Sequence, residues 1–516
     1  MDSKDGKDGV GIDLGTTHCC LYVYKHGRSP QLLKNLVGET TTPSWVCYEK
    51  GGNNVGHSAK TQSPQNPKNT IRNAKRLIGR GFDDCAVQNE VARVPFKVIN
   101  QNEIPMIPVE QQNAARETTW SATMAPEEVS ATLLKYMKEI AENFLGAVSS
   151  AVVTIPANFM ESQRAATIKA AKIAGFTEVT LLSEPTAAAT AYSHVVDERC
   201  TILVFDFGGG TLDIAIMDVQ GRNQYRVLTT DGDMYFGGEA FDDAIVQYFL
   251  QDIKSKHGVN LKDDTRAKAV LKLKAEEAKI HLSYPYHNFY KETVYGLPDA
   301  LKYEAVLNRD TFSGMFDRLL KKMLEPVKRA LQSAGKTAEE IDKVILVGGS
   351  TKLPAVQEAL RKFFRADIVA ADATPDEVIA RGAAMHCYRV NNHLPANVTE
   401  VTAFHYRLKL YHGDVSELIP RGTEFPYKFK KVYRTAYDNH VEVVFDVFQS
   451  KHGFTADKFQ IGHFKIKDLP ARKQGECAFD VTYEIDRNNI LHATAQGQFD
   501  LANYKRSVDI SLANMA

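Results

Sequence analysis

Aspartate followed by glycine and threonine occurs twice in this chain, each time between two apolar runs that predict β-strands. The stretch "GVGIDLGTTHCCLYVY" (9–24) contains Asp13, and "VFDFGGGTLDIAIMDV" (204–219) contains Asp206. A strand follows both loops, whereas a helix follows the glycine loops of Walker and dinucleotide-binding motifs. Backbone N–H groups in such a hairpin converge on an anion, and a carboxylate beside phosphate needs a cation such as Mg²⁺ between them. The sequence therefore predicts two hairpins that clamp a polyphosphate and its metal.

Either hairpin alone is explained as well by an ordinary glycine turn beside a strand-end aspartate, but two copies with the same residue order favour phosphate binding. A third segment, "VILVGGSTKLPAVQEALRKFF" (344–364), predicts a strand, a glycine turn and a helix whose N-terminus can face a ligand. Glycines are common at strand–helix turns, so this segment adds little by itself.

The composition limits the class of protein. Among 516 residues, 63 Lys and Arg balance 63 Asp and Glu, which argues against nucleic acid or an anionic membrane as a partner. The start "MDSKDGKDG" is not a secretory signal, no apolar run approaches the ~20 residues that span a bilayer, and "SLANMA" at the end is no retention or lipidation signal. The cysteines are scattered and form no CxxC pair, which favours thiols in a reducing compartment: Cys19, Cys20, Cys47, Cys85, Cys200, Cys387 and Cys477. We expect a soluble protein of the cytoplasm, with the nucleus as an alternative.

Two patterns divide the chain. Up to about residue 390, apolar strands alternate with helices, which is typical of α/β domains. The predicted strands include 151–156, 201–207 and 343–349, and the predicted helices include 126–146, 162–176 and 263–283. Beyond about residue 400, short alternating strands separated by turn residues predict an antiparallel β-domain. We therefore place domains at 1–390 and 404–516, joined by a linker at 391–403.

Over nearly its whole length the chain resembles the seventy-kilodalton heat-shock chaperones, members of the actin and sugar-kinase ATPase superfamily. The motifs that carry the resemblance are "GIDLGTT" (11–17), "NAKRLIGR" (73–80), "AVVTIPANF" (151–159), "EPTAAATAY" (184–192), "FDFGGGTLD" (205–213), "GGEAFD" (237–242) and "LVGGSTKLP" (346–354). The resemblance implies a duplicated actin-like (ribonuclease-H-like) ATPase domain followed by a peptide-binding β-sandwich. It also implies binding of ATP or ADP with Mg²⁺ and K⁺.

The catalytic roles are carried over from this resemblance. Asp13, Glu184 and Asp206 match carboxylates that hold magnesium, mostly through water, and Asp213 matches an aspartate near a monovalent cation. Lys75 matches a lysine that reaches the transferred phosphoryl group, where it neutralises developing charge. From the residues alone, Lys75 could equally be a solvated lysine in a basic run, and Glu184 a carboxylate at a helix start.

The resemblance also implies the nucleotide contacts. The phosphate-loop positions are Gly15, Thr16, Thr17, His18, Gly208, Gly209, Gly210 and Thr211, and the base and ribose positions are Glu276, Lys279, Ser283, Gly348, Gly349, Ser350, Lys352 and Asp376. Pro156 and Arg164 match positions that relay the nucleotide state to the peptide domain. The chain departs from the family pattern at four positions: His18 replaces tyrosine, Ile280 and Lys352 replace arginines around the adenine, and Asn73 replaces aspartate.

The C-terminal part resembles the family's sandwich more loosely. Leu408, Leu410, Tyr433 and Val443 match positions that line the peptide groove, although the buried face of a strand has the same pattern. "ANVTEVTAF" (396–404) stands where the family has a leucine-rich acidic linker, and neither a helical lid nor an acidic tail motif is expected.

The resemblance favours an ATP-driven chaperone that hydrolyses ATP slowly and binds extended apolar segments of unfolded proteins weakly. J-domain co-chaperones and nucleotide-exchange factors are the implied partners, and we expect a monomer. Two alternatives remain open: a nucleotide-binding regulator of other chaperones with little turnover, and a small-molecule kinase of the same ATPase fold. The C-terminal β-domain argues against the kinase.

Overall fold

The computed structural model describes residues 7–112, 118–192, 199–221, 224–371, 374–395, 398–410, 413–451, 458–498, 501 and 505–509. Part of the predicted linker (396–397) and the C-terminal "SLANMA" therefore lie outside the described residues. Among the described helices, none is both long enough and apolar enough to cross a membrane.

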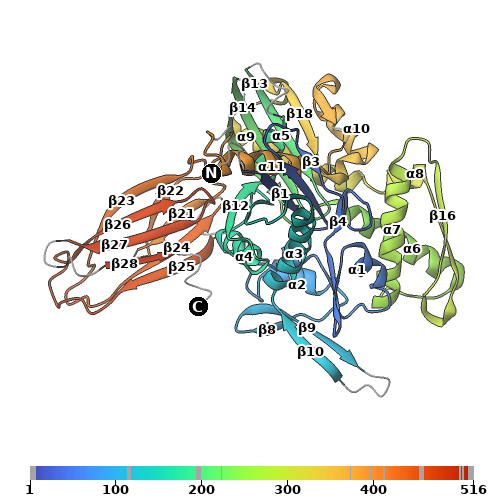
Figure 1. Ribbon diagram of the computed structural model, residues 1–516, viewed down its shortest axis with the longest axis horizontal. Helices are drawn as coiled ribbons and strands as arrows, with labels where there is room; N and C mark the ends of the chain where they lie inside the picture. Colours follow the sequence, from blue (N-terminus) through green and yellow to red (C-terminus); the bar gives the residue numbers. More distant parts are fainter. Residues whose placement is uncertain are drawn as a thin grey trace.

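Two six-stranded sheets organise the ATPase part, one in each of two lobes (Figure 1). The first lobe (within residues 7–192) contains β1 (Gly9–Leu14), β2 (His18–Tyr24), β3 (Gln31–Leu32), β4 (Thr41–Pro43), β5 (Trp45–Glu49), β6 (Gly52–Val55), α1 (His57–Gln62), β7 (Thr70–Arg72), η1 (Ala74–Arg76), α2 (Cys85–Val91), β8 (Ile99–Gln101), β9 (Ile104–Gln112), β10 (Thr118–Met124), α3 (Pro126–Leu145), β11 (Ser150–Ile155), α4 (Glu161–Ile173), β12 (Glu178–Ser183) and α5 (Glu184–Tyr192). Its main sheet has the order β12-β11-β1-β2-β3, with β4 also paired to β2.

The second lobe (within residues 199–391) repeats this arrangement. It contains β13 (Cys200–Phe207), β14 (Leu212–Gly221), β15 (Gln224–Asp233), α6 (Gly238–His257), α7 (Thr265–Ser283), β16 (Phe289–Val294), η2 (Pro298–Ala300), β17 (Tyr303–Asn308), α8 (Arg309–Gly314), α9 (Asp317–Ala334), η3 (Ala338–Glu340), β18 (Lys343–Val347), η4 (Gly349–Lys352), α10 (Pro354–Phe363), η5 (Ala366–Ile368), β19 (Val369–Ala371) and α11 (Val378–Asn391). As β1 pairs antiparallel with β2 and parallel with β11, so β13 pairs antiparallel with β14 and parallel with β18. The predicted duplicated fold is thus confirmed.

The two lobes are joined where their closing helices cross. Helix α11, at the end of the second lobe, packs on β1 of the first lobe and also crosses α5. A Cβ atom on Gly382 would lie 1.8 Å from the carbonyl oxygen of Ala187, and one on Gly11 would lie 2.1 Å from the backbone nitrogen of Ala384. Because only glycine allows these approaches, Gly382 and Gly11 let α11 pack closely against α5 and β1 and so join the two lobes.

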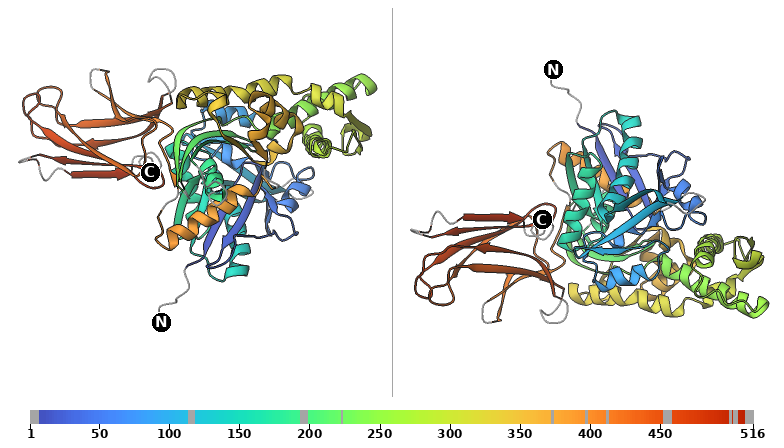
Figure 2. Two further views of the ribbon diagram at one scale, coloured as in Figure 1. Left: turned by 90° about the horizontal axis from the view of Figure 1, so that it is seen from above. Right: turned by 90° about the horizontal axis from the view of Figure 1, so that it is seen from below.

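The remaining strands form a β-sandwich beside the ATPase part (Figures 1 and 2). After β20 (Val398–Thr399) come β21 (His405–Lys409), β22 (Val415–Ile419), β23 (Tyr427–Arg434), β24 (Val443–Ser450), β25 (Lys458–Ile466), β26 (Ala478–Ile485), β27 (Leu491–Gly497) and β28 (Lys505–Asp509). The sheets have the orders β22-β21-β24-β25 and β23-β26-β27-β28, and every pairing within them is antiparallel. The predicted antiparallel β-domain is therefore confirmed.

The linker segment packs against the ATPase part. Strand β20 extends the sheet of the second lobe by pairing in parallel with β15. Val398 and Val401 are both buried in one apolar cluster with residues of that sheet, among them Val227 and Ile345. Residues 398–399 of the linker thus form an added edge strand of the second lobe.

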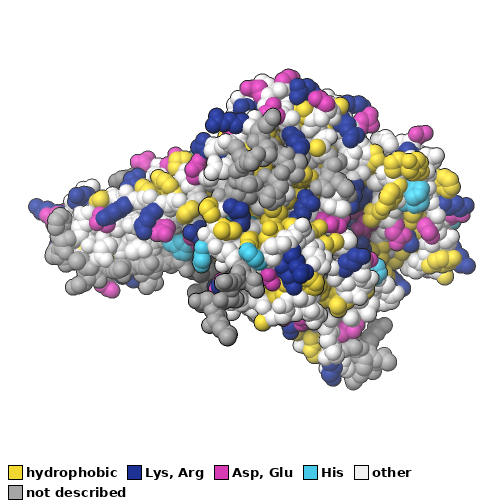
Figure 3. All heavy atoms as spheres, turned by 45° about the horizontal axis from the view of Figure 1, so that its top comes forward, with side chains coloured by type: hydrophobic (Ala, Val, Ile, Leu, Met, Phe, Trp, Pro, Cys, Tyr) yellow, Lys and Arg dark blue, Asp and Glu magenta, His cyan; other side chains and the backbone are white. Residues whose placement is uncertain are grey.

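The helices and strands predicted from the sequence occur with small shifts. The three predicted helices correspond to α3, α4 and α7, and the three predicted strands to β11, β13 and β18. The segment 344–364 differs, because the 3₁₀ turn η4 separates its strand from its helix α10. On the face shown in Figure 3, cationic and anionic side chains are interspersed, as the balanced composition suggests.

Candidate active site

A cavity of about 980 Å³ lies between the two lobes. The structure brings most of the predicted site residues to its wall: Asp13, Gly15, Thr16, Thr17, His18, Lys75, Glu184, Gly208, Gly209, Gly210, Thr211, Glu276, Lys279, Ser283, Gly348, Gly349, Ser350, Lys352 and Asp376. Asp206 and Asp213 are almost completely buried on the paired strands β13 and β14, directly opposite each other. The cavity is large enough for a nucleotide.

The two glycine hairpins face each other across this cavity. A Cβ atom on Gly209 would lie 2.1 Å from Thr17 Oγ1, and one on Gly210 would lie 2.5 Å from Thr16 Cγ2. Side chains at these glycines would therefore collide with the opposite hairpin. This close approach explains the run of glycines after Asp206, and it presents backbone N–H groups from both lobes to one anion.

A buried lysine and two carboxylates lie together in the wall of the cavity. Lys75 Nζ lies 2.7 Å from Glu184 Oε1, and Thr154 Oγ1 donates to Asp13 Oδ1 at 2.9 Å. Burial by itself lowers the pKa of Lys75, but Glu184 and Asp13 outweigh it and bring that pKa above its ordinary value. Lys75 is therefore a charged side chain fixed inside the site, which excludes the solvated lysine that the basic run alone allowed.

The carboxylates carry more negative charge than Lys75 balances. Burial and then Glu184 raise the pKa of Asp13 to about 7 and that of Asp213 to about 7. The same two causes raise the pKa of Asp206 well above its usual range. Asp206 Oδ2 and Asp213 Oδ2 are buried and accept no hydrogen bond from the part of the chain that the structure describes.

These groups fit cations. Repelling carboxylates with unpaired oxygens are stabilised in ionised form when a cation lies beside them. Within the described residues, however, no three His, Cys, Asp or Glu side chains are arranged to ligate a metal directly. Contacts of the carboxylates to Mg²⁺ through retained water fit this arrangement, since Mg²⁺ usually keeps several waters when it binds.

The far end of the cavity is lined by α7 and η4. Lys352 Nζ pairs with Asp376 Oδ1 at 2.7 Å, and Lys60 Nζ pairs with Glu276 Oε2 at 2.7 Å. Ile280 also lines this end and is 51% exposed. This end therefore offers one open apolar surface and two neutralised ion pairs, a suitable environment for a flat heterocyclic base with a polar edge.

Two further predicted residues near this end have definite partners. Lys279 Nζ lies 2.7 Å from Asp242 Oδ1, and Ser283 Oγ donates to the carbonyl oxygen of Lys279 at 2.8 Å.

His18 also lines the cavity. Burial lowers the pKa of His18 to about 4, so its imidazole is neutral near pH 7. His18 therefore adds no charge to the phosphate end.

The predicted groove residues of the sandwich do not share one environment. Leu408 is 2% exposed and Val443 is 9% exposed, and both pack in the core of the sandwich. Tyr433 packs against that core, whereas Leu410 is 36% exposed. Leu408 and Val443 thus lie on the buried faces of their strands. An apolar groove that is open to a peptide remains a prediction.

The predicted relay residues lie where the two domains meet. Arg164 is buried and donates to the carbonyl oxygens of Phe159 and Ala157, and Pro156 is buried directly before them. One helical turn earlier, Glu161 Oε1 accepts from the backbone N–H of Leu491 in the sandwich at 2.6 Å. Burial raises the pKa of Glu161 to about 8.

Some residues of the site and interface were not singled out from the sequence. Glu239 and Asp242 lie within the quoted motif "GGEAFD", so a signal for them existed, but their partners are far away in the chain. Asp231, which pairs with Lys451 of the sandwich at 3.1 Å, belongs to no motif. Nor does Tyr284, which lines the base end of the cavity.

Known proteins resemble this chain over nearly its whole length. The family model described as "Hsp70 protein" matches residues 9–514. The chain is also similar to "Heat shock 70 kDa protein BIP3" of Oryza sativa subsp. japonica, with 37% identity over 496 residues that cover 94% of this chain and 73% of the relative. Fold, site and sequence agree, and the chain belongs to the Hsp70 protein family.

Proposed function

We propose that this Hsp70-family protein hydrolyses ATP slowly to ADP and phosphate. The observation that carries the proposal is the buried pair of Lys75 and Glu184 beside Asp13 at the closed end of the cavity. Asp13 and Glu184 would help to hold Mg²⁺, mostly through water, and the ion would supply positive charge for the phosphates. Lys75 would neutralise charge on the transferred phosphoryl group, and the threonine and glycine N–H groups of both hairpins would hold the remaining phosphates.

Glu184 has a positioning role in this proposal. It holds the Lys75 ammonium by an ion pair in a place from which water is largely excluded. The unpaired Oδ2 of Asp213 would face K⁺. Single-turnover hydrolysis of ATP, with ADP binding measured in parallel, tests the proposal. ADP binding without hydrolysis would favour the alternative of a chaperone regulator with little turnover.

The altered base end leads to a prediction about affinity. We expect Ile280→Arg together with Lys352→Arg to tighten ADP binding about tenfold, because a guanidinium plane stacks on a base, whereas isoleucine and lysine do not. Calorimetric titration of ADP measures the change. Lys328→Arg is the matched control, because Lys328 forms an exposed ion pair on α9. We expect this variant to bind ADP with unchanged affinity. An unchanged affinity in the double variant would contradict the prediction.

We also propose that residues 404–516 bind extended apolar peptides weakly and release them quickly. The burial of Leu408 and Val443 supports this, because little of their apolar surface is open to a peptide. In stopped-flow measurements with a fluorescent apolar peptide, we expect fast release from the ADP state and little change on adding ATP. Slow release that ATP accelerates about a hundredfold would show strong coupling and contradict the prediction.

The remaining proposals concern binding partners, oligomeric state and location in the cell. We infer that unfolded polypeptides, J-domain co-chaperones and nucleotide-exchange factors are the partners, and that the protein acts as a monomer. The seven cysteines are all free thiols, which supports a reducing compartment such as the cytoplasm. Fluorescence microscopy of the tagged protein in its own cells tests the location.

A further inference from the structure

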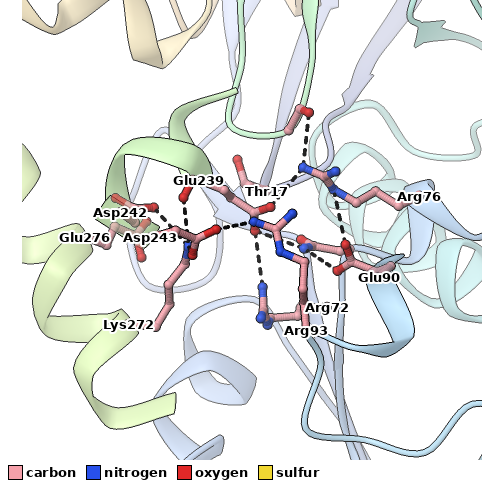
Figure 4. Close-up of polar contacts among 12 residues, drawn as sticks. Thr17, Arg72, Arg76, Glu90, Arg93, Glu239, Asp242, Asp243, Lys272 and Glu276 are labelled. Carbon is pink, nitrogen blue, oxygen red and sulfur yellow. Dashed lines mark hydrogen bonds and ion pairs between the residues drawn. The ribbon is translucent and has the colours of Figure 1, made fainter. Parts of the chain in front are cut away.

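A dense polar network links the two lobes beneath the phosphate hairpins (Figure 4). Its centre is Glu239, in the first turn of α6 in the second lobe. Three side chains of the first lobe reach this carboxylate: Asn73 Nδ2 at 2.9 Å, Arg76 Nη2 at 3.0 Å and Arg72 Nη1 at 3.2 Å. All of these side chains are buried or nearly so, which makes their hydrogen bonds stronger than they would be in water.

Asn73 has an unusual place in this network. Its φ of 57° lies in the left-handed region, which asparagine adopts more easily than most residues. Its amide nitrogen donates to Glu239 in one lobe and, at 2.9 Å, to Glu90 in the other. The amide thus joins two carboxylates that would otherwise repel each other.

The same turn holds the catalytic lysine. Asn73 is the residue directly before the short helix η1, which contains Lys75 and Arg76. Arg76 Nη2 also donates to the carbonyl oxygen of Gly210 in the second phosphate hairpin at 3.1 Å, and the N–H of Glu239 donates to the carbonyl oxygen of Gly209 at 2.9 Å. The network therefore connects the turn that carries Lys75 to the hairpin that faces the phosphates.

The network holds Glu239 in its charged form. Burial would raise the pKa of Glu239, but Arg76, Lys272 and Arg72 outweigh it and lower that pKa to about 2. Its attraction for the first lobe is therefore present at any physiological pH. If the lobes part, these contacts are lost together.

We propose that Asn73 and Glu239 form a latch that closes the two lobes over bound nucleotide and sets how fast the nucleotide leaves. The proposal rests on the nucleotide site proposed above. Asn73 is a positioning residue in it, because it acts on the nucleotide through the turn that carries Lys75.

Release of a fluorescent ADP analogue, followed by stopped flow, tests the latch. We expect Asn73→Ala and Glu239→Gln each to speed release about tenfold or more, the scale of losing a hydrogen bond to a buried charged group. Arg72→Gln is a milder variant at the more exposed edge of the network, and it should speed release less. Lys274→Ala removes an ion pair within one helix of the second lobe and should leave the release rate unchanged.

A double variant separates the latch from a general loss of structure. Asn73→Asp sets a third carboxylate against Glu239 and Glu90 and should also speed release. Combining it with Glu239→Gln restores one donor and one acceptor across the lobes, so the double variant should release ADP more slowly than Asn73→Asp alone. Equal release from the parent and both single variants, or no rescue in the double variant, overturns the latch. If the parent binds no ADP at all, the proposed function fails as well, so the two failures are distinguishable.

Discussion

Lys75→Met is expected to lower single-turnover ATP hydrolysis about 10²-fold or more while nucleotide still binds. The ammonium is a positive charge beside Asp13 and Glu184 in the cavity wall, and its 2.7 Å contact with Glu184 fixes its position. Methionine has a similar length and no charge, so the cavity keeps its shape. The charge that develops on the phosphoryl oxygens then lacks the preorganised ammonium as a partner.

Radiolabelled ATP at enzyme excess measures the chemical step, and calorimetry with ADP measures binding. Lys328→Met, at an exposed ion pair on α9, is the matched control and should hydrolyse ATP like the parent. If Lys75→Met hydrolyses ATP at the parental rate, Lys75 is not the group that stabilises the transferred phosphoryl. A loss of binding together with hydrolysis would make Lys75 a binding residue instead.

The hairpins could be predicted from sequence because their chemistry is local. Asp13 and Asp206 each sit within a few residues of the glycines and threonines that complete the phosphate loop. The strands around them follow from apolar runs, and each pairs with its neighbour in the chain. Such signals need no knowledge of the rest of the fold.

The latch could not be predicted in the same way. Glu90 belongs to no quoted motif and Glu239 lies in "GGEAFD", but nothing in the sequence shows that both meet Asn73, from which Glu239 is 166 residues away. The domain interface has the same property, since Glu161 meets Leu491 from far away in the chain. For the groove, Leu408 and Leu410 are two residues apart and would share one face of a continuous strand. Strand β21 ends at Lys409, however, so Leu410 lies beyond it and is 36% exposed, whereas Leu408 is buried.

The second large effect follows from the crowding of carboxylates at the site. Asp206 lies opposite Asp213, close to Glu184 and Asp13; Asp206, Asp213 and Glu184 are buried, and Asp13 is partly buried. Without a bound cation these groups repel one another and lack hydration, which raises the pKa of Asp206. Sites of this kind lower the stability of the empty protein in return for binding a cation and its ligand.

Asp206→Asn is therefore expected to have opposite effects in two assays. Hydrolysis of Mg-ATP should fall about 10²-fold or more, because one of the carboxylates expected to hold the metal is lost. The nucleotide-free protein should instead unfold at a higher temperature, since the amide carries no charge and can donate to the neighbouring Asp213. Asp367→Asn, at an exposed position, is the control and should change neither measurement.

The difference in stability between the parent and Asp206→Asn should depend on pH. A carboxyl whose pKa is raised in the folded state stabilises the fold fully only below its unfolded pKa, and this stability is lost as the pH rises through the folded pKa. The parent should therefore lose stability relative to Asp206→Asn as the pH increases, because Asp206 has such a raised pKa. Differential scanning fluorimetry without nucleotide or Mg²⁺, from about pH 5 to about pH 8, should show the gap between the two unfolding temperatures widening. A gap that stays constant, or a variant less stable than the parent at the upper end, would mean that the buried carboxylates are stabilised by contacts within the protein and do not require a cation.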